Sequence, residues 1–356
     1  MLGSMKRAFS SVVLFVALWN SAFGQSGSLV TATGKPLFTF HNGFWINLHH
    51  FLYVLGRARN GTADSQRSAV MHAPEDLEDF NALNKRDRTT WQEAIEFYRN
   101  ELSKRDVIFD RELIGITRAL ASVLDSSSLA GTALPSQVRE TLERAAPVYR
   151  RVWWDRHSRS NKTRITALSA LLVQYGPQVS NMLTHIYEQQ WPANGLDVEV
   201  SAYANWGGAY SIGGGPIIMS STDDAGTGSE GLEIVFHEAM HQWDAAMIPL
   251  LDGTAQRLNV KIPRDLFHSL IFYTAGYLVS RIVPGHRPYA EPLWARGVLP
   301  GRTQLDADWL PYLQGNGSLS SAIEKVVGAF KSPPNSLPPS PETQNSQTHR
   351  WSLIAS

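Results

Sequence analysis

The chain of 356 residues contains no cysteine. Disulfide bridges, thiol nucleophiles, lipid-modified cysteines and thiolate metal ligands are therefore excluded, and any metal site has to use His, Asp, Glu or water. The sequence also lacks an excess of charge of either sign, since 32 Lys and Arg residues balance 32 Asp and Glu residues. No overall field attracts a polyanion, so we expect no nucleic-acid partner.

Long apolar runs are missing after residue 24, so we expect no membrane span in the mature protein. Residues 1–24 begin with the basic pair Lys6 and Arg7, continue with an apolar run over about residues 10–19, and end in small residues up to Gly24. This order predicts a secretory signal peptide, and hence a secreted or periplasmic protein. The apolar run is shorter than the roughly 20 residues that span a bilayer, which disfavours the alternative of a retained anchor.

With 43% hydrophobic and 18% charged residues, the chain has the composition of a globular protein. Apolar residues recur at helical spacing through much of its first half. Helices are expected over about residues 44–60, 88–106, 110–126, 135–156 and 162–190, with a capping-box spacing at Thr90 and Glu93. Residues 25–192 therefore form a helical N-terminal part.

The pattern changes after Pro192. Residues 196–206 alternate and are rich in β-branched and aromatic side chains, glycines follow, and residues 216–221 form a short apolar run. We expect a small sheet here, containing a hairpin. The fold class is therefore α+β and predominantly α-helical. The last 25 residues, 332–356, are rich in Pro and Ser and predict a disordered tail.

A helix is expected after the sheet, with Thr227 and Glu230 at capping-box spacing and Pro249 as its end. Another follows over about residues 263–283. The first carries "HEAMH", in which His237 and His241 stand four residues apart and can bind one ion from one helix face.

The residues around this pair have the chemistry that a hydrolytic zinc site needs. Glu238 could take a proton from a metal-activated water as a general base. Asp244, one turn on, could accept the outer N–H of a ligand histidine and fix its tautomer. The opposite face bears Phe236, Met240, Trp243 and Met247, which would bury the helix, and this division favours zinc binding over a core helix with incidental histidines.

On these residues the sequence resembles the zincin metallopeptidases, whose HExxH motif stands here as His237, Glu238 and His241. The resemblance implies an active-site helix preceded by a sheet whose edge strand, here within residues 209–221, lines the cleft and binds an extended peptide. It covers residues 198–283, under a third of the chain. Residues 193–331 would then be the zincin-like, zinc-binding part.

A catalytic zinc needs a third protein ligand. The metzincin continuation of the motif is absent. The gluzincin-like branch takes a glutamate from the next helix, but that helix has none. It does contain His268, which we expect to be the third ligand, since a buried histidine without a partner costs free energy. Asp265 and Glu291 are the alternatives.

Other polar residues have weaker patterns. Tyr273, with Tyr289 behind it, is the candidate donor to a developing oxyanion. His41, His49 and His50 could form a second metal or substrate site, but adjacent histidines on a helix point apart, so we expect packing roles.

The sequence therefore predicts an exported, monomeric zinc metallopeptidase that acts on peptides or proteins. A zinc hydrolase of a non-peptide substrate, or a non-catalytic metal-binding module, are the alternatives.

Overall fold

The computed structural model describes residues 34–60, 74–124, 126–205, 207–213 and 215–331. The expected signal peptide and C-terminal tail lie outside these residues. No helix in the described ranges combines the length and apolarity that a membrane crossing requires.

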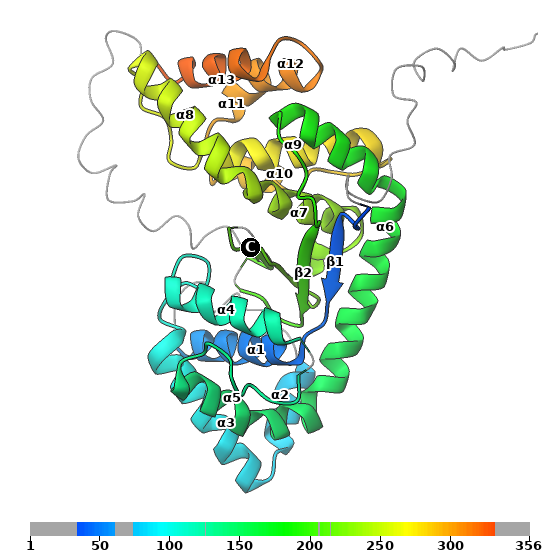
Figure 1. Cartoon of the computed structure of the whole chain (residues 1–356), viewed down its shortest axis with the longest axis vertical. Coiled ribbons are helices and arrows are strands. Elements are labelled where there is room, and N and C mark those ends of the chain that lie inside the picture. Colours follow the sequence, from blue (N-terminus) through cyan, green and yellow to red (C-terminus); the bar gives the residue numbers. More distant parts are fainter. Residues whose placement is uncertain (1–33, 61–73, 125, 206, 214, 332–356) are drawn as a thin grey trace, which may run out of the picture.

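Helices dominate the described chain, and a small sheet lies between them (Figure 1). The strands are β1 (Phe38–His41), β2 (Leu196–Ser201), β3 (Ala209–Ser211) and β4 (Ile217–Ser220). The helices are α1 (Phe44–Arg59), α2 (Pro74–Ala82), α3 (Lys85–Phe97), α4 (Arg111–Val123), α5 (Ser136–Tyr149), α6 (Asp155–Tyr187), α7 (Gly228–Met240), α8 (Asp244–Leu258), α9 (Leu266–Ile282), α10 (Glu291–Ala295), α11 (Arg302–Gln304), α12 (Leu310–Leu313) and α13 (Leu319–Gly328). The α+β, mostly helical class is confirmed.

The sheet has the order β1-β2-β4-β3. β1 and β4 both run parallel to β2, and only β3 is antiparallel to its neighbour β4. The expected hairpin is thus the β3–β4 pair, while β1 was not predicted because four residues directly before a helix give too short an alternation. β3 lies at one edge of the sheet, next to β4, which is the last strand before α7.

Two hydrophobic cores lie on opposite faces of this sheet. On β4, Ile217 and Met219 belong to one core and Ile218 to the other, as the twofold period of a strand requires. The first core contains residues of α7 and α9 and the later part of α6. The second contains residues of α1, α3, α4 and α5. Core boundaries therefore do not follow the division of the chain near residue 192.

The helix expected to break between residues 156 and 162 is continuous. A π-helical segment, Arg150–Trp154, joins α5 to α6. Two polar residues between the two predicted helices are buried and hydrogen-bonded: His157 contacts Tyr149, and Asn161 donates to Asn47. Burial with partners removes the reason for a polar stretch to leave the helix.

The helix carrying the histidine motif begins where the sequence predicts but ends earlier. α7 ends at Met240, a 3₁₀ turn (His241–Trp243) follows, and Pro249 lies inside α8, where it removes one helical hydrogen bond without ending the helix. Thr227 is the N-cap of α7, but its hydroxyl donates to the Asp224 carbonyl, so no capping box forms.

The other predicted capping box is also wrong. α3 begins at Lys85, several residues before Thr90, and its N-cap is Asn84, whose side chain accepts from the Asp87 N–H. Spacing alone could not distinguish a helix start from a position inside the helix.

Candidate metal centre

The packing of α7 against α9 positions the site. The face of the motif helix that was predicted to pack does so: Phe236, Met240, Trp243 and Met247 are all at most 5% exposed. α9 is also deeply buried, through Leu270, Ile271, Ala275 and Leu278 among others. With apolar faces fixed in the core, the histidines of the two helices can face each other.

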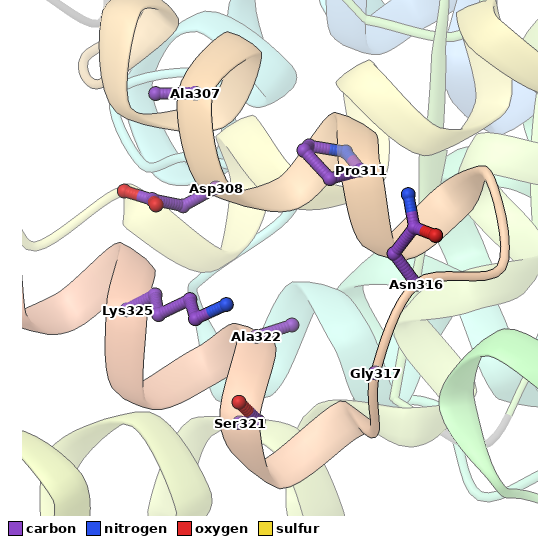
Figure 2. Close-up of a pocket in the computed structure, with 8 residues that line it drawn as sticks. All are labelled: Ala307, Asp308, Pro311, Asn316, Gly317, Ser321, Ala322 and Lys325. Carbon is purple, nitrogen blue, oxygen red and sulfur yellow. The ribbon is translucent and has the colours of Figure 1, made fainter.

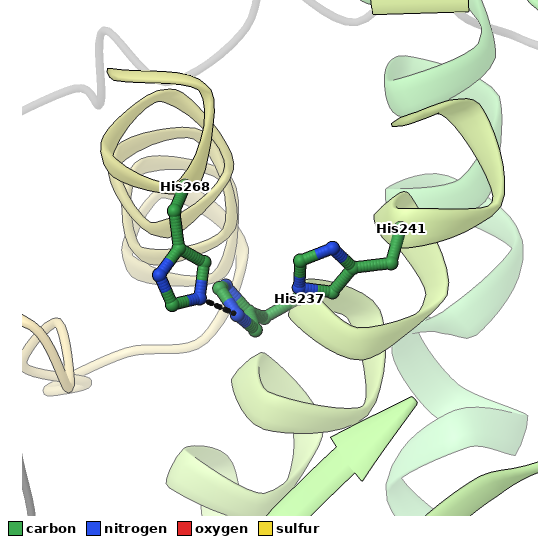
Figure 3. A group of neighbouring side chains, drawn as sticks. All are labelled: His237, His241 and His268. Carbon is green, nitrogen blue, oxygen red and sulfur yellow. Dashed lines mark hydrogen bonds between the residues drawn. The ribbon is translucent and has the colours of Figure 1, made fainter. Parts of the chain in front are cut away.

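Three histidines converge there (Figure 3). His237 comes from α7, His241 from the 3₁₀ turn that follows, and His268 from α9. One ring nitrogen from each lies within 4.8 Å of the other two. No other group of three potential ligand side chains lies as close together in the part of the chain that the structure describes.

One nitrogen–nitrogen distance in the cluster is compatible with tetrahedral coordination of zinc. The Nε2 atoms of His237 and His268 are 3.1 Å apart. Tetrahedral ligands about 2.0–2.1 Å from a zinc ion lie roughly 3.3 Å from each other. Three imidazoles are also the donor set of a catalytic zinc with a fourth position open, so the residues present fit this ion.

His241 has a carboxylate behind it. Its Nδ1 lies 3.1 Å from Asp244 Oδ1 and 3.3 Å from Oδ2. An ionised carboxylate accepts only, so Nδ1 carries a proton, and in the neutral ring Nε2 then presents a lone pair to the cluster. The structure therefore places Asp244 where a ligand-orienting residue would lie.

Electrostatics keep two of the rings neutral. Burial lowers the pKa of His237 well below its ordinary value, and His268 and His241 add to this. Burial also lowers the pKa of His268 to about 3, again with a contribution from His241. In His241, burial is outweighed by the hydrogen bond to Asp244 and the charge of Glu238, so its pKa is raised. A neutral imidazole is the form that binds a metal.

Glu238 lies beside the cluster and under the edge strand. A cavity of about 10 Å³, close to the smallest volume that holds a water, is lined by Glu238, His241 and Ser211 among others. Burial raises the pKa of Glu238, while His241 and a hydrogen bond from Ser211 act in the opposite direction. Ser211 is the last residue of β3, so the edge strand and the motif glutamate are in contact.

The predicted oxyanion donor, Tyr273, does not join the cluster. It lies five positions after His268, about 140° around α9, and its hydroxyl donates to Asp306 at 2.7 Å. Tyr289 is connected to the cluster through Phe272. The Tyr289 ring stacks on Phe272, and the Phe272 ring stacks on His237 with the ring centroids 3.8 Å apart. Phe272 was missed, although its position four residues after His268 places it on the same helix face.

The alternative third ligands do not reach the histidines either. Glu291 pairs with Arg302 at 2.7 Å on the surface. Asp265 precedes α9 as its N-cap residue and is not part of the group of converging side chains. His268 alone completes the group.

The N-terminal histidines have other partners, as the packing interpretation expects. His41 contacts Asp197 on the neighbouring strand at 3.0 Å. His49 and His50 are fully buried and contact different tyrosines, Tyr98 at 2.9 Å and Tyr210 at 2.7 Å. These three rings do not converge on one point.

A larger cavity, about 170 Å³, lies away from the histidines between the C-terminal helices (Figure 2). Its lining includes Asp308, Lys325, Pro311 and Ala322. It contains none of the side chains predicted to carry chemistry.

Comparisons with protein-family models, curated proteins and solved structures find no match for this chain. The function therefore has to be inferred from the residues and their geometry.

Proposed function

We propose that this protein is a zinc-dependent peptidase, with His237, His241 and His268 as the metal ligands and Glu238 as the general base. The observation that carries the proposal is the convergence within 4.8 Å of three imidazole nitrogens, from α7, the 3₁₀ turn after it and α9, beside a buried glutamate. Burying the imidazole of His237, which is 3% exposed, costs free energy that coordination of an ion would offset.

The chemistry divides among the named residues. When bound, zinc would supply a Lewis acid that polarises a carbonyl and acidifies water. Glu238 would accept the proton of the attacking water and pass it to the leaving amine. Asp244 would hold His241 in the ligand tautomer, and Tyr289 replaces Tyr273 as the candidate donor to the oxyanion.

The edge strand supports a peptide as the substrate. β3 is antiparallel to β4 at the edge of the sheet, and the cavity that holds Glu238 and His241 is bounded by Ser211, Ile212 and Gly213 of this edge. A cavity of about 10 Å³ is too small to enclose a substrate. An extended peptide could instead lie along the strand and present its carbonyl to the histidines.

The basic and apolar N-terminal segment supports export as the setting of this activity. We therefore place the proposed peptidase outside the cytoplasm, with exported or extracellular peptides or proteins as its substrates.

The test is cleavage of a fluorogenic peptide library by zinc-loaded protein, compared with Glu238→Gln. This change keeps the side-chain volume but removes the base, so we expect activity to fall about 10²–10⁴-fold with zinc content unchanged. Glu140→Gln, at an exposed position of α5, is the matched control and should retain full activity.

Two other outcomes of this experiment would change the proposed function. Zinc-dependent cleavage of an ester or amide substrate, with no peptide cleaved, would transfer the proposal to a hydrolase of another substrate class. Zinc binding with no Glu238-dependent activity would reduce it to a metal-binding module.

A further inference from the structure

A second set of chemically active side chains lies at the opposite end of α7. Ser229 is in the first turn of this helix, Glu233 is one turn later, and His286 is in the loop after α9. Ser229 Oγ lies 2.8 Å from His286 Nδ1, and His286 Nε2 lies 2.6 Å from Glu233 Oε2. The three form a hydrogen-bonded chain of serine, histidine and glutamate.

The carboxylate of Glu233 determines which ring nitrogen of His286 carries the proton. An ionised carboxylate only accepts hydrogen bonds, so His286 Nε2 carries the proton that it donates to Glu233. Nδ1 of the neutral ring is then an acceptor, and the Ser229 hydroxyl donates to it. A base aimed at a serine hydroxyl, and oriented by a carboxylate, is the arrangement that activates a nucleophile.

The acid and the base are buried, and their contacts hold the imidazole in place. The His286 side chain is 0% exposed and the Glu233 side chain 1%. The Tyr289 N–H also donates to Glu233 Oε2, at 2.9 Å. Burial raises the pKa of Glu233, and these two hydrogen bonds act in the opposite direction by stabilising the carboxylate, the form that orients the ring.

Ser229, in contrast, is only half-buried and has open space beside it. A methyl group added at the preceding residue, Gly228, would meet nothing within 4 Å. The N–H groups of Ser229 and Glu230 have no hydrogen-bond acceptor within the described residues. They belong to the first turn of a 13-residue helix and can stabilise an oxyanion formed at Ser229.

We propose that Ser229 is an acylatable nucleophile, with His286 as its general base and Glu233 as the residue that orients His286. The substrate class is a small ester or another activated acyl compound. Ser229 is eight residues before His237, about 12 Å along the helix, so this activity needs no metal.

The reaction balances with water as the only co-reactant. Ser229 Oγ bonds to the acyl carbon while its proton moves to His286 Nδ1. The tetrahedral adduct collapses, the ester C–O bond breaks, and the leaving alkoxide takes the proton from Nδ1. Water then attacks the acyl-Ser229 carbon and gives a proton to Nδ1. The carboxylic acid leaves, and that proton returns to Ser229 Oγ.

The first test is labelling of the full chain with a fluorophosphonate in the presence of a metal chelator. Mass spectrometry should find the adduct on Ser229, and its rate of formation should fall at least 10-fold in His286→Asn. Absence of an adduct on Ser229, or an unchanged rate in His286→Asn, would overturn the proposal and leave these residues as a structural contact.

A second test does not depend on the folding of a His286 variant. Because the chain has no cysteine, Ser229→Cys introduces a single thiol. An adjacent base raises the thiolate fraction, so iodoacetamide should alkylate this thiol at pH 7 about 10-fold faster than that of Ser280→Cys. Ser280 is exposed on α9 and contacts only a backbone carbonyl. Equal rates in the two variants would also overturn the proposal.

Discussion

His241 differs from His237 because a carboxylate lies behind its ring. Its 3.1 Å contact with Asp244 fixes the proton on Nδ1 and leaves Nε2 for a metal. His237 has no such partner: its Nδ1 is buried without a hydrogen bond within the described residues. The ring orientation of His241 is therefore fixed more firmly than that of His237, with consequences for the proposed binding of a metal.

We expect Asp244→Ala to weaken zinc binding by about 10–100-fold, because removing the carboxylate frees the His241 ring to rotate and change tautomer. A competition titration with a chelator of known affinity measures this. Asp252→Ala, at an exposed position of the same helix, is the control. Equal zinc affinities in the two variants would show that Asp244 does not orient the ligand.

At the scale of the helices, the site depends on how closely α7 and α9 approach. Gly276 of α9 permits this approach, because a Cβ atom there would lie 2.7 Å from Pro288 Cβ and 3.1 Å from Glu233 Oε1. The glycine thus makes room for the loop after α9 and for the buried glutamate of α7.

Gly276→Ala should lower the free energy of unfolding by about 1–3 kcal/mol, the usual cost of overpacking a core. Gly253→Ala, on α8, should have the opposite effect, since nothing lies within 4 Å of the added methyl and alanine favours a helix by about 1 kcal/mol. The free energies of unfolding in urea of both variants test this prediction. A Gly276→Ala protein as stable as wild type would contradict it.

A buried carboxylate ties α2 to α6. Asp76 is 6% exposed and accepts hydrogen bonds from Arg156, Tyr203 and, at 3.1 Å, His157 Nε2. Burial alone would raise the pKa of Asp76, but the contacts with His157, Tyr203 and Arg156 outweigh it, so the pKa is lowered. The carboxylate therefore stabilises the folded state.

A lowered carboxyl pKa means that this stabilisation is present above the unfolded pKa of about 3.9 and is lost as the pH falls through the lower folded value. Asp76→Asn should cost about 3 kcal/mol at pH 7, and the difference from wild type should shrink below about pH 4. Asp79→Asn, which removes a partly exposed partner of Arg156, should cost under about 1 kcal/mol. Urea midpoints measured at pH 7 and pH 3 test this, and an Asp76→Asn cost independent of pH would contradict it.

Periodic patterns in the sequence predicted the elements of the site, whereas contacts between distant segments became visible only in the structure. The four-residue spacing of His237 and His241 and the apolar opposite face were sufficient to predict the motif helix. The partner of Tyr273 could not be predicted, because Asp306 lies 33 residues away and no local pattern connects the two residues. The same holds for β1, which pairs with a strand more than 150 residues later.

At the scale of the whole molecule, one small sheet separates two cores, and the histidine cluster lies beside the first of them, where α7 packs against α9. α7 and α9 both contribute to that core, so an ion held between them would join two of its principal helices. A metal that binds the folded chain and not the unfolded chain would stabilise the folded state by mass action.

Free zinc at 100 times its dissociation constant should therefore raise the free energy of unfolding by about 2.7 kcal/mol. Thermal unfolding with zinc and with a chelator measures the effect, and His268→Ala should show none of it. An equal zinc effect in His268→Ala would mean that the ion binds elsewhere.

We propose that His237, His241 and His268 together hold one zinc ion. Metal content by mass spectrometry on wild type and on the three single alanine variants tests it most directly, with the exposed His185→Ala as control. We predict about one zinc per chain in wild type and His185→Ala, and little in each of the other three. No stoichiometric zinc in wild type after incubation with the ion, or full occupancy in His268→Ala, would contradict the account.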